Sequence, residues 1–421
     1  MGRAPRPAWA ALGVVLAALV ASVAQASSAG GMDNSIVVQA ARVFSNGGSP
    51  YDDQRFLYFP SAVPAAVPQL FVPSFVLRVL VPVVTTGLLV AAWACALRLY
   101  GVPWRSRFAV LGLVGLAVGF APFAHLVRLG NWTATAAAAL PLAVLLMSRG
   151  RWGTAGVVLG AAVALKPLLA PMVLLFVFAR RWRGLGLMVL VPAVASGGSA
   201  LLMPDPAGFF TRTLPHLVSG QDDFARLYEA SLGVVLPRLG VPQAVAAVVA
   251  VVAAGAGLWC AYGRWRRGGD AVLRLTETAC LLMLSAFLVS RPSFDHYLML
   301  VLPLLLASAV LPGSVARSPW FWLALIPQMP GFTWQLLEVP TRRAFKDAAT
   351  LCALVVTLAR HRPPVEELAP AAPAHSPVES PPQSPPQSPP QSPPQSPPQS
   401  PPQGLGPFDP AKGAAPLDPR V

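Results

Sequence analysis

Two charged side chains are candidates for chemistry because the sequence around them is almost wholly apolar. Asp33 follows the first apolar run and begins the segment DNSIVVQAARVF, whereas Lys166 lies within an apolar hairpin predicted over residues 153–179. A carboxylate at a membrane surface can act as a general base toward an attacking hydroxyl, or it can cap the helix that it begins. A charged lysine at membrane depth is unfavourable in free energy unless it pairs with an anion or serves a function. Lys166 is therefore a candidate partner for a phosphate or for a carboxylate.

Further polar candidates share the predicted outer side with Asp33. Ten of the twelve acidic residues before the tail lie in predicted outer segments, and only Asp270 and Glu277 do not. Either acids simply avoid the Arg-rich inner loops, or the outer face is a polar working surface. The second interpretation selects two acid pairs, two arginines suited to phosphate and an Asp–His pair: Asp52 with Asp53, Asp222 with Asp223, Arg128, Arg212, and Asp295 with His296.

Each of these candidates has a simpler alternative. The acid pairs would be solvated loop residues, and Asp52 with Asp53 could otherwise hold a divalent cation. The arginines would anchor the topology, although the planar guanidinium of Arg212 suits bidentate phosphate contact. Adjacent residues on a helix point to different sides, so Asp295 and His296 are expected to line a site rather than to act as one pair.

The composition dictates the environment that must position these groups. The chain has 421 residues, 55% of them hydrophobic and only 11% charged, and its mean hydropathy is +0.58. Soluble domains have about 25% charged residues, so an ordinary soluble protein is excluded. The net charge of +14 comes from arginines in short loops between apolar runs. That pattern fits the orientation of membrane helices and argues against nucleic-acid binding.

Apolar runs near 20 residues, the length of a membrane helix, predict an all-α polytopic membrane protein with about 11–12 membrane segments. The first run follows two arginines and is either an uncleaved helix or a signal peptide. Residues 33–44 have apolar side chains at helical spacing and are expected to lie on the membrane surface. The remaining segments are predicted near 74–97, 108–124, 131–147, 153–179, 185–203, 241–262, 271–289, 296–311, 319–339 and 344–360.

The hairpin at 153–179 is predicted because Arg-rich loops flank it on both sides and both should be inside. Pro167 breaks the helical hydrogen-bond ladder, and the residue before a proline avoids helical angles. Two short arms meeting at Lys166 therefore satisfy the charge rule. Discontinuous helices of this kind also line transport paths, which makes a transporter or flippase of a saccharide the main alternative function.

The chain divides into a polytopic domain, residues 1–362, and a tail, residues 363–421. The tail contains six SPPQ units between Ser380 and Gln403. Such a segment cannot bury apolar surface, so it is predicted to be disordered and cytoplasmic. It would be a passive spacer or the ligand of a proline-recognition partner, in which case the protein could be a scaffold.

Several catalytic motifs are absent from the sequence. It has no GxxxxGK[ST] loop, no strand–GxGxxG–helix unit, no HExxH, no GxSxG and no Asp-x-Asp. The four cysteines lie in apolar stretches without metal-ligand spacing. An enzyme of this kind would more naturally use a donor dissolved in the membrane, such as a lipid-phosphate sugar.

Four stretches resemble glycosyltransferase family 87, membrane enzymes of the polyprenyl-phosphate-dependent C-type architecture. They are NGGSPYDDQRFLYFP at 46–60, the Gly-rich helix, Lys-Pro and Arg-Trp-Arg loop within 130–185, PDPAGFFTRTLPHLVSGQDDF at 204–224 and SRPSFDHYLMLVLP at 290–303. The third is most similar to actinobacterial branching α-(1→3)-arabinofuranosyltransferases. The chain departs from the family at Tyr58-Phe59-Pro60 and at Glu229-Ala230-Ser231.

The resemblance implies an inverting transfer of arabinofuranose or mannose from a polyprenyl-phosphate donor to an extracytoplasmic glycan or lipid-linked acceptor. The active site would face outward from a bacterial plasma membrane, in contact with membrane lipid. No nucleotide would be needed, and a divalent cation is left open. Asp33 would be the catalytic base and the other candidates would bind the donor phosphate or line the site: Lys166, Arg212 and Arg128 for phosphate, and Asp52, Asp53, Tyr58, Asp222, Asp223, Asp295 and His296 for the acceptor.

Overall fold

Helices dominate the computed structural model, which describes residues 2–27, 30–219, 227–330 and 339–361. These ranges belong to one compact unit of the chain. Within them there is no β-strand beyond an isolated bridge between Arg3 and Ser106. The predicted all-α membrane architecture is therefore confirmed. The tail, together with Asp222 and Asp223, lies outside the described residues.

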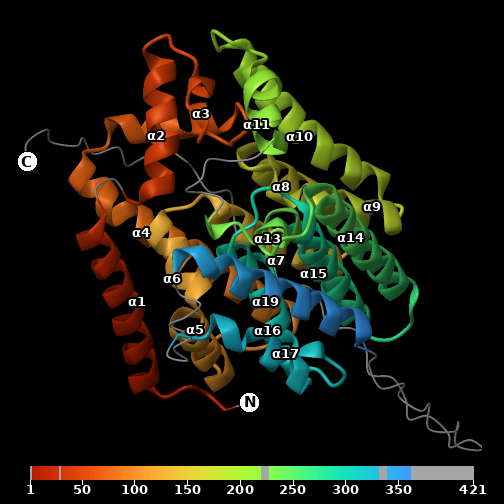
Figure 1. Cartoon of the computed structure of the whole chain (residues 1–421). Helices are drawn as coiled ribbons and strands as arrows, with labels where there is room; N and C mark the ends of the chain where they lie inside the picture. Colours follow the sequence, from red (N-terminus) through yellow and green to blue (C-terminus); the bar gives the residue numbers. More distant parts are fainter. Residues whose placement is uncertain (1, 28–29, 220–226, 331–338, 362–421) are drawn as a thin grey trace, which may run out of the picture. The chain divides into compact units, whose positions relative to one another are not determined.

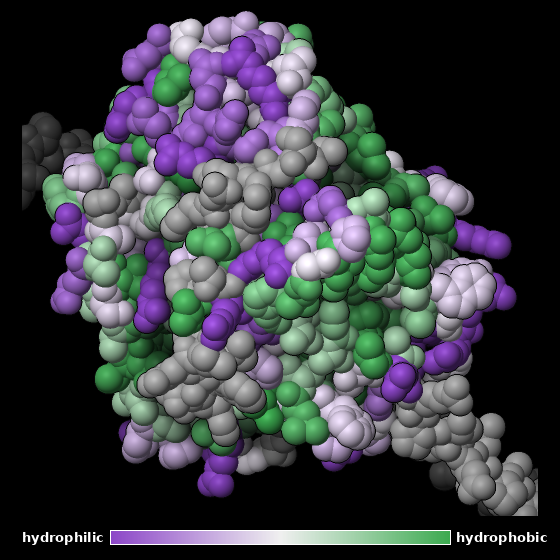
Figure 2. All heavy atoms as spheres, viewed as in Figure 1, coloured by the Kyte–Doolittle hydropathy of each residue, from purple (hydrophilic) through white to green (hydrophobic). Residues whose placement is uncertain are grey.

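Among the described residues, five helices are long and apolar enough to cross a membrane: α1 (Arg6–Ala26), α4 (Ser74–Leu99), α10 (Trp182–Leu201), α14 (Gln243–Arg266) and α15 (Ala271–Val289). Their burial differs sharply. In α15, 78% of the apolar window is buried, against 17% in α1 and α10. Helix α15 is therefore a core helix, and the others expose apolar side chains such as Val194, Val252 and Trp259, as expected of a surface in lipid. Figure 2 shows these hydrophobic flanks in green.

A sixth span is bent. Helices α5 (Arg107–Gly119) and α6 (Ala121–Leu129) meet at an angle of 70°. Phe120 between them is extended, and Pro122 stands in the first turn of α6. A proline has no backbone N–H and is well tolerated in a first turn, so it favours a new helix here over a continued one. The segment predicted as a single span near 108–124 therefore consists of two helices. The second of them, α6, packs against η5 (Asp295–Leu300).

The predicted hairpin is also broken where the sequence indicates. Helix α8 (Trp152–Leu165) ends at Lys166, which is extended at φ −147° and ψ 123°, and the chain continues through η3 (Pro167–Met172) and α9 (Val173–Phe178). Helices α7 (Thr133–Ser148) and α10 pack against α8. The hairpin therefore presents Lys166 at its break and not inside a straight helix.

Two of the C-terminal segments are interrupted where single helices are predicted, and the third is longer than predicted. The span expected near 296–311 is η5 (Asp295–Leu300), α16 (Leu302–Ala307) and η6 (Ser308–Val310), and η7 (Val315–Arg317) follows. The span expected near 319–339 begins as α17 (Pro319–Leu325) and η8 (Ile326–Gln328), and residues 331–338 lie outside the described residues. Helix α19 (Pro340–Arg360) extends the prediction of 344–360 by one turn. Prolines at 303, 319 and 327 account for the interruptions.

One end of the bundle holds the connecting segments that the sequence places outside. Helix α2 (Met32–Ser45) matches the predicted surface helix and packs with η1 (Pro50–Asp52), α3 (Ala62–Ala66) and η2 (Val67–Phe71). A small apolar cluster that includes Val37, Tyr51 and Phe209 holds them together. The second connection contains η4 (Phe209–Thr213), α11 (Leu214–Ser219) and α13 (Leu232–Arg238). Figure 1 shows α2, α3 and α11 at the top, opposite α5 and α17, and Figure 2 shows that this end is hydrophilic.

Candidate active site

A large cavity of about 1280 Å3 opens beneath α2, where the outer segments meet α6, the hairpin break, η5 and α19. Eight of the eleven site residues predicted from the sequence line it, although they come from five separate stretches of the chain: Asp33, Asp52, Asp53, Tyr58, Arg128, Lys166, Asp295 and His296. Of the other three, Arg212 is not in this lining, and Asp222 and Asp223 lie outside the described residues.

Close backbone contact between glycines brings Asp33 to the cavity. Gly31, at φ 123°, precedes α2, and a Cβ on it would collide with the backbone of Leu129 and Gly130. Gly130 ends α6 in the left-handed conformation, at φ 59°, and a Cβ there would collide with the carbonyl of residue 30. Only glycine permits both conformations with so small a separation. This contact places the start of α2 beside the start of α7.

Asn131 joins the two candidates named first from the sequence. Its Nδ2 donates to Asp33 Oδ2 at 2.5 Å, and Lys166 Nζ donates to its Oδ1 at 3.1 Å. Lys166 also donates to Thr133 Oγ1 at 2.9 Å. Asp33 does not cap α2, because Gly31 is the N-cap and no side-chain cap bond forms there. Its carboxylate instead lies in the first helical turn, where the helix dipole favours negative charge.

Both charged groups keep hydrogen-bonding capacity toward the cavity. Within the described ranges, Asp33 Oδ1 has no hydrogen-bond donor, and Lys166 uses two of its three N–H donors. The ammonium lies 5.3 Å from the ring centres of both Tyr58 and Tyr297. Aromatic faces at this distance stabilise a cation without occupying its hydrogen bonds. A carboxylate and an ammonium therefore face one cavity and are bridged by one amide.

A second cluster surrounds Asp295, at the start of η5. Its Oδ2 accepts from Arg343 Nη2 of α19 at 2.7 Å and lies 2.5 Å from His125 Nδ1 of α6. Its Oδ1 accepts from the backbone N–H of His296 at 2.7 Å. Burial opposes ionisation of this carboxyl, but the hydrogen bonds from both histidines and the charge of Arg343 outweigh it and hold the pKa of Asp295 well below its usual range.

His296 is nearly inaccessible, with 2% of its surface exposed, yet it lines the cavity. Its ring stacks on Phe294 at 5.6 Å, and its Nδ1 lies 3.5 Å from Asp295 Oδ1. Its Nε2 is buried without a hydrogen-bond partner among the described residues. Buried polar atoms are normally satisfied, so this nitrogen is suited to a group that enters the cavity.

Arg212 forms a bridge outside the cavity lining. Its guanidinium, in η4, pairs with Asp52 of η1 and with Asp205 at 3.3 Å. Both Arg212 and Asp52 are about half exposed. Arg212 therefore joins the two outer connections, and it reaches the site through Asp52, which does line the cavity.

Asp53 and Arg128 stand at the rim. Asp53 accepts two side-chain hydrogen bonds from Arg55, both at 3.0 Å. Burial raises the pKa of Asp53, but these bonds and the Arg55 backbone N–H outweigh that effect and lower it overall. Arg128 is exposed and has no ion-pair partner in the part of the chain that the structure describes. It is therefore available for an anionic ligand.

Sequence reasoning missed three contributors to the site. Asn131 is part of the glycosylation motif Asn131-Trp132-Thr133, and that motif gives no indication of a contact with Asp33. Arg343 lies next to the start of the helix predicted at 344–360. Arg291 borders the cavity and pairs with buried Glu229 at 3.3 Å. The available signal for Asn131 was a polar residue immediately after Gly130 and before an apolar helix.

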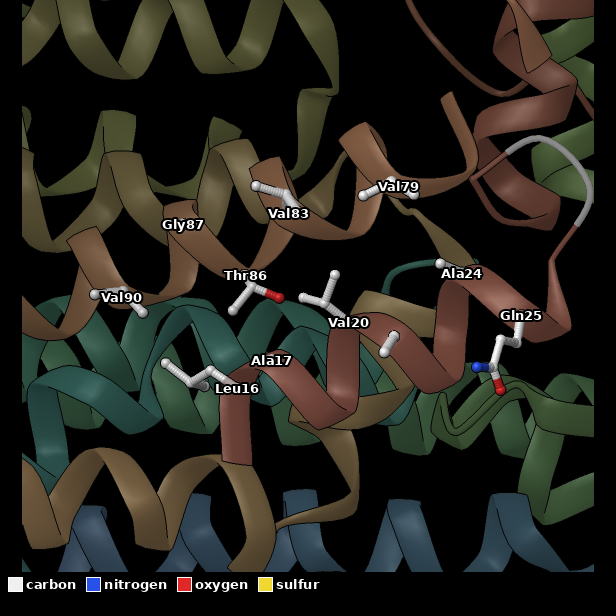
Figure 3. A pocket seen from close by; sticks show the side chains of 11 residues that line it. Leu16, Ala17, Val20, Ala24, Gln25, Val79, Val83, Thr86, Gly87 and Val90 are labelled. Atoms are coloured by element: carbon white, nitrogen blue, oxygen red, sulfur yellow. The ribbon is translucent and has the colours of Figure 1, made fainter. Parts of the chain in front are cut away.

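Two further features concern ligands. Within the described ranges, no group of three His, Cys, Asp or Glu side chains is arranged to hold a metal ion. Separately, an apolar groove of about 700 Å3 runs between α1 and α4, shown in Figure 3. It extends from Leu16 and Val90 to Gln25 and Val79. Gln25 and Val79, at its second end, stand near the ends of α1 and α4 that join the segment carrying Asp33.

Comparison with known proteins agrees with this architecture. Residues 56–290 match the sequence model of glycosyltransferase family 87. The chain is 30% identical over 301 residues to an alpha-(1->3)-arabinofuranosyltransferase of Mycobacterium tuberculosis, covering 68% of this chain and 66% of the relative. A protein of the same name from Mycolicibacterium smegmatis is 31% identical over 196 residues, 46% of this chain and 44% of the relative. One from Corynebacterium glutamicum is 25% identical over 198 residues, 45% of this chain and 47% of the relative.

These matches have defined limits. The chain covers slightly less than two thirds of the length of the Mycobacterium tuberculosis relative. The family match begins at residue 56 and ends at residue 290, so it includes Lys166 and Arg212 but neither Asp33 nor Asp295. No solved structure matches the chain.

Proposed function

The chain belongs to glycosyltransferase family 87, and from that premise we propose that it transfers a sugar from a polyprenyl-phosphate donor to a hydroxyl of an extracytoplasmic glycan or lipid-linked acceptor. One observation supports this most strongly: a carboxylate and an ammonium, Asp33 and Lys166, face the same cavity and share Asn131. Such a pair suits a reaction that needs a base for one substrate and positive charge for the other.

The proposed step is a single displacement with inversion at the anomeric carbon. Asp33 Oδ1 removes the proton of the acceptor hydroxyl as its oxygen bonds to the anomeric carbon. The bond from that carbon to the phosphate oxygen breaks, and polyprenyl phosphate departs with the electron pair. General-base assistance of this kind contributes about 10²- to 10⁴-fold in rate.

Positive charge is needed where the leaving phosphate develops negative charge. Lys166 has one remaining N–H donor directed at no described residue, and Arg128 is exposed on the cavity lining. We assign both to the donor phosphate. Arg212 contributes from outside the lining, where its charge is shared with Asp52 and Asp205.

The other polar side chains of the cavity are assigned to the acceptor. His296 Nε2 can hydrogen-bond a sugar hydroxyl, and Tyr58 provides an aromatic face beside Lys166. Asp52 and Asp53 at the rim, with Asp295 fixed beside His296, complete this set. The names of the relatives favour arabinofuranose as the sugar, with mannose as the alternative.

The donor also needs an apolar binding site for its isoprenoid chain. We assign the groove between α1 and α4 to that chain because it is apolar and because its end at Gln25 and Val79 is the end where both helices join the segment that carries Asp33 (Figure 3). The burial of apolar chain is favourable by about 0.8 kcal/mol per CH2 group. In this proposal the donor phosphate lies at the outer membrane surface, and the Arg-rich loops predicted to be cytoplasmic support a site that faces away from the cytoplasm.

The donor class can be tested with the purified full chain in liposomes. Polyprenyl-phosphate arabinofuranose, polyprenyl-phosphate mannose and a nucleotide-activated sugar are offered in parallel, each labelled in the sugar, with an arabinan oligosaccharide as acceptor. We expect transfer from a polyprenyl-phosphate donor and none from the nucleotide sugar. Transfer from the nucleotide sugar alone would contradict the proposal, as would transport of saccharide without any new glycosidic bond.

A further inference from the structure

The orientation of the Asn131 amide is fixed by its neighbours. Its Oδ1 accepts from Lys166 Nζ at 3.1 Å and from the backbone N–H of Thr133 at 2.7 Å. Both partners are donors, so the oxygen must face them and Nδ2 must face Asp33. Asn131 is also 5% exposed, so its side chain has little freedom to turn away.

We propose that Asn131 is a positioning residue for the transfer: its amide holds Asp33 Oδ2, directs Oδ1 toward the acceptor hydroxyl and links the base to Lys166. This inference rests on the proposed function. The role requires a hydrogen-bond donor and an acceptor on two atoms of one short side chain. The amide of Asn supplies both, whereas Ala, Ser and ionised Asp do not supply them in this geometry. A shift of about 1 Å in a catalytic group can cost about 100-fold in rate, so the holding contact matters to catalysis.

A purely structural role is the alternative, because Asn131 Oδ1 also satisfies the Thr133 N–H near the start of α7. Asp serves such a position about as well as Asn. The substitution Asn131→Asp therefore separates the two roles. It keeps an oxygen for Thr133 and Lys166, but it replaces the donor to Asp33 by a second carboxylate.

Two carboxylates this close cannot both ionise readily, so the first ionisation of the pair is favoured and the second moves to higher pH. The titratable and charged groups that face Asp33 come from the first outer loop, the hairpin and η5: Tyr58, Lys166, His296 and Tyr297. All of them are unchanged in Asn131→Asp. A shift in the pH profile is then attributable to the new carboxylate.

The experiment measures kcat/KM against pH for the full chain in liposomes, with Gln39→Glu as control. Gln39 is exposed on the same helix as Asp33 and contacts Arg42, so this change adds the same charge without touching the site. We expect the acid limb of the Asn131→Asp profile to move up by about one pH unit or more, which lowers kcat/KM by up to about tenfold at pH values on that limb. The profile of Gln39→Glu should match that of the wild type.

A second variant keeps the test decisive if Asn131→Asp does not fold. Asn131→Ala should lower kcat by about 10- to 100-fold while the KM for donor changes little. An unshifted acid limb in folded Asn131→Asp would overturn the inference, as would an unchanged kcat in Asn131→Ala. If Asp33→Asn were also fully active, the proposed function would fail instead, so the two failures are distinguishable.

Discussion

Two clusters of charged side chains in this apolar chain differ in what surrounds them. At the outer end, Asp33 and Lys166 face a cavity of about 1280 Å3 and keep hydrogen-bonding capacity toward it. Between α14 and α15, Arg264 pairs with Glu277, whose other oxygen accepts from the Val315 N–H at 3.3 Å. These two side chains are 6% and 3% exposed and line neither the cavity nor the groove. The two clusters therefore differ in access: the first has unused hydrogen-bonding capacity that faces a cavity, and the second lines no pocket described above.

The sharpest way to break this comparison is to remove one cation from each cluster. Lys166→Met should lower kcat about 100-fold or more, because it removes the positive charge that stabilises the leaving phosphate. Its effect on the melting temperature Tm should be smaller. Arg264→Met should leave kcat of the folded protein unchanged but destabilise it by about 3–5 kcal/mol, because it strands Glu277 without its partner. Activity per folded molecule and Tm in detergent measure the two effects. The opposite pattern would show that the roles are reversed.

Asp295 lies between these extremes, since it lines the cavity but is enclosed by partners. Asp295→Asn should destabilise the protein by about 3 kcal/mol at pH 7, because Arg343 and His125 lose a shared acceptor. A carboxyl with a depressed folded-state pKa stabilises the fold above its unfolded pKa and loses that contribution only as pH falls through the folded value. The difference in Tm between wild type and variant should therefore stay constant from pH 8 to pH 5. A difference that shrinks across that range would contradict the tight pairing.

The groove of Figure 3 extends the comparison to apolar surface. A Cβ added at Gly87 on α4 meets no atom within 4 Å, and the same is true of Gly186 on α10. Gly87→Phe should fill the groove and raise the KM for donor about tenfold, equivalent to the lost burial of roughly two CH2 groups, with kcat little changed. Gly186→Phe is the matched control on a helix that does not line the groove. Equal effects of the two changes would remove the groove from the account.

The smallest effect is expected at Arg212. Its ion pairs with Asp52 and Asp205 are half exposed, and such pairs contribute about 0–1 kcal/mol. Arg212→Ala should therefore change Tm only slightly and reduce transfer less than Lys166→Met does. A loss of rate equal to that of Lys166→Met would place the donor phosphate at Arg212.

Local sequence patterns were sufficient for much of this architecture. Apolar residues at helical spacing predicted the surface helix at 33–44, found as Met32–Ser45, and Pro167 predicted the break at Lys166. The 271–289 helix was predicted at its observed bounds. In these cases the determining interactions are short in sequence, namely helical periodicity and the proline ring.

The missed features depend on contacts between distant segments. Asn131 meets Asp33 only because Gly31 packs against Gly130, and no periodicity indicates that pairing. Arg343 and Asp295 are 48 residues apart in the sequence, and no local pattern indicates that their side chains form a hydrogen bond. The bend at Phe120 was missed because one proline two residues later favours a new helix without prohibiting a continued one. Residue types near the site were thus predictable, but their partners were not.

The central claim is that Asp33 is the base of a lipid-donor glycosyl transfer, and one measurement tests it most directly. Wild type, Asp33→Asn and Asp270→Asn are reconstituted in liposomes, and formation of the labelled glycosidic product from polyprenyl-phosphate arabinofuranose or mannose is followed. Asp270 begins α15 and caps it through Leu273 N–H, a role that Asn can fill, so it is a matched control. We predict that Asp33→Asn loses at least about 100-fold in rate at unchanged Tm while Asp270→Asn retains it. Undiminished transfer by folded Asp33→Asn would contradict the account.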